Sequence, residues 1–83
     1  MPKYNIELRT ADRVWDTFQF ESDDLTALRV EMAQFIGELL RDHAKEIWTD
    51  EEWRVDATDE KGLILFVMSI TASNSAATMR LRR

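Results

Sequence analysis

The sequence predicts one α+β domain of ββαββ type, in which a four-stranded antiparallel sheet carries one long helix packed on one of its faces. Three observations predict this class. Apolar and polar residues alternate in short segments on both sides of the middle of the chain, one long central segment has helical spacing, and turn residues separate the short segments in pairs. A length of 83 residues suits one hydrophobic core and one sheet.

The first two strands are predicted over residues 3–9 and 14–21, and the polar stretch 10–13 joins them as a hairpin. In both segments apolar and polar residues alternate, which is typical of a strand with one buried face. The apolar positions on that face are Tyr4, Ile6, Leu8, Phe18 and Phe20.

A long helix is predicted from Asp24 to Ile47. Ser22, Asp23 and Asp24 offer side-chain oxygens to the first free helical N–H groups, and the acidic charge suits the positive end of the helix dipole. At about 1.5 Å per residue this helix is roughly 36 Å long, enough to run along a sheet. Its core stripe, spaced by three and four residues, is Leu25, Leu28, Met32, Phe35, Ile36, Leu39, Leu40, His43 and Ile47.

The last two strands are predicted at residues 53–57 and 63–71, joined by a turn at 58–62. Asp59 and Gly62 fit a type I turn closed by a left-handed glycine, because glycine adopts positive φ without steric cost. The strand 63–71 is apolar on both faces, which predicts a central position in the sheet. Its bulkier residues, assigned to the helix side, are Ile64, Phe66, Met68 and Ile70.

The domain is predicted to span residues 1–71. Both periodicities end at Ala72, so residues 72–83 are expected to form a mobile tail. The N-terminal residues alternate as in a strand and do not indicate a signal peptide. The longest apolar run, residues 63–68, is far shorter than the roughly 20 residues of a membrane-spanning helix. We therefore expect a cytoplasmic protein without a membrane partner.

Composition excludes several function classes. Cysteine is absent, which removes disulfides, thiolate nucleophiles and metal sites built on thiolates. The net charge is −5, and three of the 11 Lys and Arg residues lie among the last four residues. Residues 1–79 therefore carry 8 basic against 16 acidic side chains. Such an acidic body repels phosphate backbones, so nucleic-acid binding by the domain is not expected.

No residue belongs to a recognisable catalytic, cofactor-binding or metal-binding pattern. His43 is the only histidine, and Asp42 and Glu46, one and three residues away, do not orient its imidazole as a catalytic triad does. A structural role at the end of the helix is expected for His43. The acidic runs lack the pattern of a calcium loop, and two glycines are too few for a phosphate loop. The sequence therefore predicts a protein without enzymatic activity or cofactor.

Two surfaces are predicted to be available for interaction. The sheet face opposite the helix is apolar, with no second helix to cover it, and its burial would contribute about 25 cal/mol per Å². On the helix, small residues flank the core stripe. Gly37 lowers the stability of the helix by about 1 kcal/mol relative to alanine, and close contact with a helix of another subunit would explain its presence. The candidate interaction surface is Trp15, Leu63, Leu65, Val67, Ala33 and Gly37.

Contacts within the same chain could instead account for both surfaces. Polar neighbours and the tail would partly cover the sheet face, and the helix flank would pack on its own sheet. The flank also includes Thr26, Val30 and Ala44.

The leading functional hypothesis is a non-enzymatic interaction or regulatory module. It would form a homodimer through one apolar surface and bind an unknown protein through another. The second hypothesis is a small-ligand-binding or catalytic domain, with a pocket between helix and sheet lined by His43, Trp48 or Trp53. The third is a nucleic-acid accessory protein that acts through the tail residues Arg80, Arg82 and Arg83.

Three short segments also resemble a known family. They are Met1–Arg9, the helix start at Asp24-Leu25, and the turn Asp59-Glu60-Lys61-Gly62 before an apolar strand. Together they resemble a family of short alphaproteobacterial proteins, common in rhizobia, known only as a domain of unknown function. The resemblance covers roughly residues 1–70. It supports the fold and implies no catalytic residues.

Overall fold

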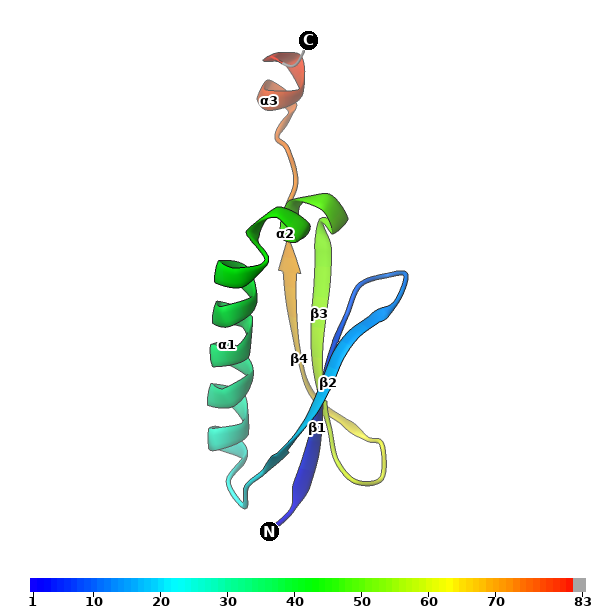
Figure 1. Ribbon diagram of the computed structural model, residues 1–83, viewed down its shortest axis with the longest axis vertical. Helices are drawn as coiled ribbons and strands as arrows, with labels where there is room; N and C mark the ends of the chain where they lie inside the picture. Colours follow the sequence, from blue (N-terminus) through cyan, green and yellow to red (C-terminus); the bar gives the residue numbers. More distant parts are fainter. Residues whose placement is uncertain (82–83) are drawn as a thin grey trace.

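A four-stranded antiparallel sheet and a helix on one of its faces form the two layers of the chain (Figure 1). The computed structural model describes residues 1–81, with the side chains of residues 1–78. The strands are β1 (Lys3–Arg9), β2 (Val14–Glu21), β3 (Glu52–Thr58) and β4 (Ile64–Thr71). The helices are α1 (Leu25–Asp42), α2 (Ala44–Asp50) and α3 (Ala76–Leu81). The α+β class and the ββαββ order are confirmed.

The two hairpins form as the sequence predicts. In the turn between β3 and β4, the Gly62 amide donates to the Asp59 carbonyl at 3.1 Å, and Gly62 has φ 87°. The Asp59 carboxylate accepts from the amides of Lys61 and Leu63, each at 2.9 Å. The turn thus closes through a residue at positive φ, which glycine adopts without steric cost, so the left-handed glycine is confirmed.

The position of β4 differs from the prediction. The strand order is β2-β1-β3-β4, so β4 lies at an edge of the sheet and β1 and β3 form its centre. The reason is the pairing of Ile6 with Ala57 and of Leu8 with Val55, which joins the two hairpins through their inner strands. The prediction of a central position from apolar residues on both faces is therefore wrong. On the outer face of β4, the apolar side chain of Val67 is 49% exposed.

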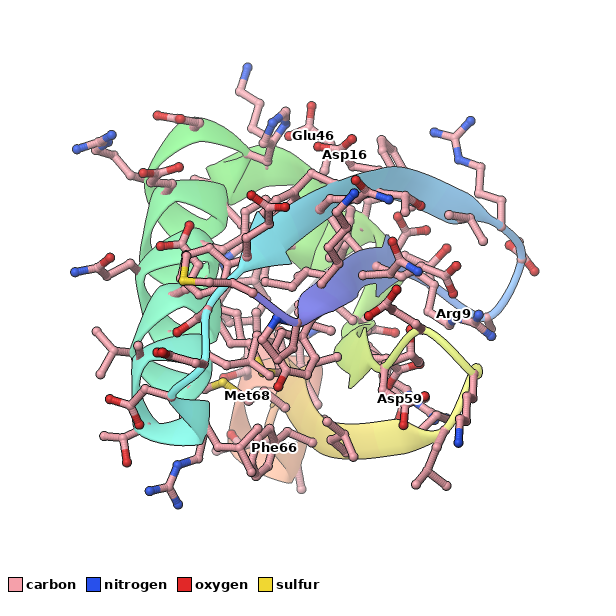
Figure 2. The ribbon with its side chains drawn as sticks, turned by 90° about the horizontal axis from the view of Figure 1, so that it is seen from below. Arg9, Asp16, Glu46, Asp59, Phe66 and Met68 are labelled. Atoms are coloured by element: carbon pink, nitrogen blue, oxygen red, sulfur yellow. The ribbon has the colours of Figure 1, made fainter. Side chains whose placement is uncertain are left out.

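The core lies between α1 and the sheet. Phe66, Met68 and Ile70 of β4 pair with the core-facing residues of β3 and lie on the helix side, as predicted (Figure 2). Ile64 is exposed instead, because the strand register shifts between Ala57 and Thr58. The buried apolar residues are Tyr4, Ile6, Leu8, Leu28, Met32, Ile36, Leu39, Ile47, Trp53, Val55 and Ala57.

The predicted helix from Asp24 to Ile47 is divided at His43. Asp24 caps its start, with the carboxylate accepting from the Thr26 amide at 2.9 Å. At His43 the backbone leaves the helical region, with φ −126° and ψ 41°. The chain then turns, so that α2 lies across the end of the sheet where β3 begins and β4 ends (Figure 1). This turn places Ile47 in the core, with 5% exposure.

The segment after β4 contains α3, which lies beyond the end of the sheet and gives the chain a length of 55 Å along its longest axis (Figure 1). Its predicted mobility stays a prediction. Arg82, Arg83 and the side chain of Arg80 lie outside the described part of the chain, so their role with nucleic acid also stays a prediction. No helix within residues 1–81 is long and apolar enough to cross a membrane.

Candidate functional site

The outer edge of β4 is open. Within residues 1–81 no strand pairs with it, so a row of main-chain N–H and C=O groups faces outward. β4 has neither a charged residue nor a proline. The opposite edge strand, β2, carries Asp16 and Glu21 and a register shift at Trp15, which are features that discourage pairing with another chain. We call β4 the open edge.

Apolar side chains surround the open edge. Leu63 and Val67 are 62% and 49% exposed, and Ile64 is also exposed. Between β4 and α1 lies a groove of about 290 Å³, whose lining residues are Arg29, Met32, Phe66, Val67 and Met68. The groove extends the apolar surface from the strand to the helix.

The helix flank adjoins this groove. Ala33 and Gly37 follow Arg29 at intervals of four residues, so all three lie on one side of α1. A Cβ atom at Gly37 would meet no described atom within 4 Å, apart from its own helical turns. Packing on its own sheet therefore does not explain Gly37. All predicted flank residues are exposed: Thr26, Val30, Ala33, Gly37 and Ala44. Leu25 and Leu40, which the sequence prediction assigned to the core stripe, are exposed as well.

Trp15 does not belong to the surface predicted for it. Leu8 pairs with Asp16 and Arg9 pairs with Val14, which leaves Trp15 as an extra residue in β2. Its ring lies on the helix side, with its centroid 5.0 Å from that of Trp53. The predicted residues thus separate: Leu63 and Val67 lie at the open edge, Ala33 and Gly37 on the flank, and Leu65 is half-buried against the core.

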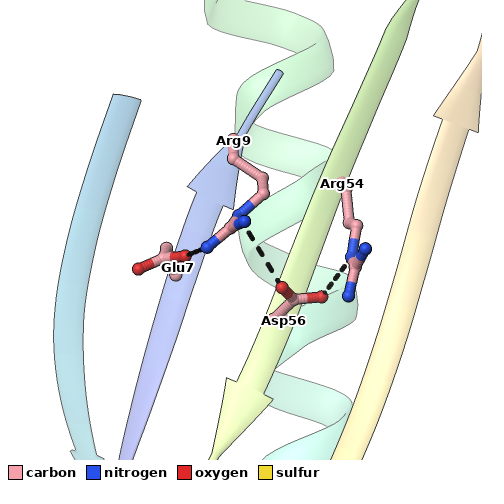
Figure 3. A network of polar contacts seen from close by, with 4 residues as sticks. All are labelled: Glu7, Arg9, Arg54 and Asp56. Carbon is pink, nitrogen blue, oxygen red and sulfur yellow. Dashed lines mark hydrogen bonds and ion pairs between the residues drawn. The ribbon is translucent and has the colours of Figure 1, made fainter. Parts of the chain in front are cut away.

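The middle of the outer sheet face is charged. Asp56 is the central residue, with only 4% of its side chain exposed, and Arg54 Nε donates to its Oδ1 at 2.7 Å (Figure 3). Arg9 Nε lies 3.8 Å from Asp56 Oδ2, and its Nη2 donates to Glu7. The hydrogen bond to Glu7 and the charge of that carboxylate raise the pKa of Arg9. The face is therefore less apolar than predicted, and its exposed apolar residues gather at β4.

Asp56→Asn is expected to lower the free energy of unfolding by about 1–2 kcal/mol, because the negative charge that pairs with Arg9 and Arg54 is lost while both arginines keep their charges. The partial exposure of both arginines limits the loss. Urea unfolding measures it, with Glu60→Gln in the exposed turn as control. An unchanged midpoint for Asp56→Asn would contradict this role.

A second hollow lies between α1 and the β2 side of the sheet, at the end near α2. We call it the aromatic cleft, of about 210 Å³, lined by Leu8, Trp15, Asp16, Phe35, Glu38, Leu39, Asp42, His43 and Trp53. Of the three predicted pocket residues it contains His43 and Trp53, whereas Trp48 is 61% exposed elsewhere. The sequence prediction missed Trp15 and Phe35, whose positions depend on the shifted register of β2 and the packing of α1. In the described part of the chain, no three His, Asp or Glu side chains are grouped to hold a metal ion.

Comparison with known proteins identifies the family of this chain. A family model described as a domain of unknown function, DUF6894, matches residues 3–71. This range contains all four strands, α1 and α2, and excludes α3. No curated protein and no solved structure matches the chain.

Proposed function

The chain belongs to the DUF6894 family of domains of unknown function, and we propose that it is a non-enzymatic protein-interaction module that forms a homodimer through β4. The observation that supports this most is the open edge, an eight-residue edge strand without charge, proline or cover from the described residues. Edge strands of this kind pair readily with another strand.

A second copy of the same chain is the partner that fits the edge. Two β4 strands related by a two-fold axis run antiparallel, so the free N–H and C=O groups of each satisfy those of the other. No charge on β4 opposes its own copy. The product is a continuous sheet with twice the number of strands, in which neither copy of β4 has a free edge.

The flank of α1 contributes to the same interface. Strands lie about 4.8 Å apart. The first half of α1 lies beside β4, where Arg29 and Met32 line the groove, and α1 contacts β3, so at this end the two helices come within roughly 10–15 Å of each other across the axis. Close helix contact needs about 8–10 Å, which small residues permit. Ala33 and Gly37 supply this space beside the groove.

The area of a stable dimer interface is a second reason to include α1. A stable dimer buries roughly 800 Å² of each partner, or about an eighth of the 6109 Å² surface of this chain. One edge strand alone is too narrow for that area. The groove and the α1 flank supply the further surface that such a dimer needs.

Light scattering after size exclusion tests the proposal. The expected molar mass is twice the 9.8 kDa of one chain, and it should fall toward the single value on dilution. A mass of one chain at every concentration would overturn the homodimer. The unknown protein partner, the cytoplasmic location and the alphaproteobacterial origin stay predictions.

Gly37→Gln separates the two roles of the helix flank. In the isolated chain the new side chain meets open space, and the better helix propensity of glutamine is expected to raise the free energy of unfolding by about 0.5 kcal/mol. In the dimer the same side chain occupies the space between the helices, so the dissociation constant is expected to rise about tenfold. Sedimentation and urea unfolding at high dilution measure the two effects. Glu31 lies about 120° around α1 from Gly37, so Glu31→Gln is the control.

A further inference from the structure

Aromatic rings line the aromatic cleft and suit a planar apolar group. Trp15 and Trp53 meet at 45° with their centroids 5.0 Å apart, and Phe35 is held edge-on by Phe18 at the same distance. Leu8 and Leu39 complete the apolar lining. The rings come from three elements, so the folded chain sets their arrangement before a ligand arrives.

The charge of the cleft is negative. Its lining contains the carboxylates of Asp16, Glu38 and Asp42, the imidazole of His43, and no Lys or Arg among the described side chains. Asp42 pairs only with exposed Arg41 at 3.2 Å, a contact that water screens. Glu38 has no ion-pair partner in the part of the chain that the structure describes. An anionic ligand would be repelled here and a cation attracted.

The cleft lining also contains a hydrogen-bond donor without an acceptor among the described residues, the indole N–H of Trp53. Trp53 is 1% exposed, and its buried indole Nε1 has no hydrogen-bond acceptor within the described residues. Buried polar groups nearly always have a partner, but an ammonium group has no acceptor to offer this N–H, so the donor takes no part in the site proposed below. By contrast, Trp15 Nε1 donates to Thr10 Oγ1 at 3.2 Å.

Trp15 already carries a cation. The Arg13 guanidinium carbon, which is not part of the cleft lining, lies 3.7 Å from the centroid of the Trp15 ring in a cation–π contact. Aromatic rings beside carboxylates attract organic ammonium groups for the same electrostatic reason. The volume of 210 Å³ is below the roughly 300–1,000 Å³ of sites for drug-sized ligands, so the ligand must be small.

From these contacts we propose that the aromatic cleft binds a small organic cation, an amine on a compact aromatic or planar apolar body. The ring packs against the half-buried Trp15 and Phe35, with the buried Trp53 beneath them, and the ammonium group faces Glu38 and its neighbouring carboxylates. This site goes beyond the proposed homodimer, because it lies on the β2 side of α1, away from the open edge.

Titration of the intact, ¹⁵N-labelled chain with 2-phenylethylammonium tests the proposal by NMR. The indole N–H signals of Trp15 and Trp53 are expected to shift with saturation, whereas that of exposed Trp48 stays in place. The anion 3-phenylpropanoate, with a similar ring and chain, should cause no saturable shift. Glu38→Gln should weaken amine binding about threefold, and Trp15→Leu should abolish it.

Glu60→Gln is the matched control, because it makes the same chemical change in the turn at the opposite end of the sheet (Figure 1). Absence of saturable shifts, equal shifts with the anion, or unchanged affinity in Glu38→Gln would each overturn the proposal. Repeating the titration on the Val67→Lys variant tests whether amine binding depends on the dimer. The affinity for the amine should equal that of the parent chain, whether or not the parent chain self-associates.

Discussion

Val67→Lys is expected to weaken the homodimer. Val67 lies near the middle of β4 and faces outward beside Asp56, so a two-fold axis brings two copies of the new lysine together. The outer sheet face stays open to water in this dimer, so two opposed lysines cost about 1 kcal/mol, which raises the dissociation constant about fivefold. The isolated chain should keep its fold, because Val67 is already 49% exposed. Sedimentation velocity over a concentration series measures the change.

Thr17→Lys is the control for this experiment. Thr17 is exposed on the other edge strand, β2, so the same charge appears at an edge that the proposal leaves free. The dissociation constant of this variant should equal that of the parent chain. If Val67→Lys remained as dimeric as Thr17→Lys, self-association through β4 would be ruled out.

Trp53→Ala is expected to remove a large part of the free energy of unfolding. Trp53 is 1% exposed and contacts Trp15, and replacing a buried tryptophan by alanine costs about 3–5 kcal/mol. The total stability of a chain of this size is only about 4–12 kcal/mol. Far-ultraviolet circular dichroism during urea titration measures the loss. A small loss would mean that the core between α1 and β3 tolerates a large cavity.

Trp48→Ala is the matched variant, since it removes the same side chain from a position that is 61% exposed. Its free energy of unfolding should change by about 0.5 kcal/mol or less. The pair therefore separates the effect of burial from the effect of losing a tryptophan. Equal losses in both variants would contradict the core described for this fold.

Local patterns in the sequence predicted the elements well. The bounds of β1 and β2, the cap at Asp24 and the left-handed Gly62 all follow from residues close to one another in the chain. Each depends on alternation, a capping side chain or a positive φ, which neighbouring residues decide. The helix break at His43 was missed, because the apolar spacing continues into Ile47 while the backbone changes direction.

The candidate sites were harder to predict. The sequence indicated exposed apolar residues on β4 and small residues on the helix, but it placed Trp15 among them. The extra residue in β2 turned Trp15 toward Trp53, and this shift depends on how β2 pairs with β1. Glu38 joined the aromatic cleft for a similar reason, because the packing of α1 on the sheet sets its position.

The sequence by itself determined the strands, the turns, the helix start and the acidic, cysteine-free composition, since these depend on residue type and short-range spacing. Only the tertiary structure decided that β1 pairs with β3, which leaves β4 as an edge. It also brought Trp15, Phe35 and Trp53 together beside three carboxylates. Strand order and side-chain clusters depend on contacts between distant segments, and no local pattern encodes which of those segments meet.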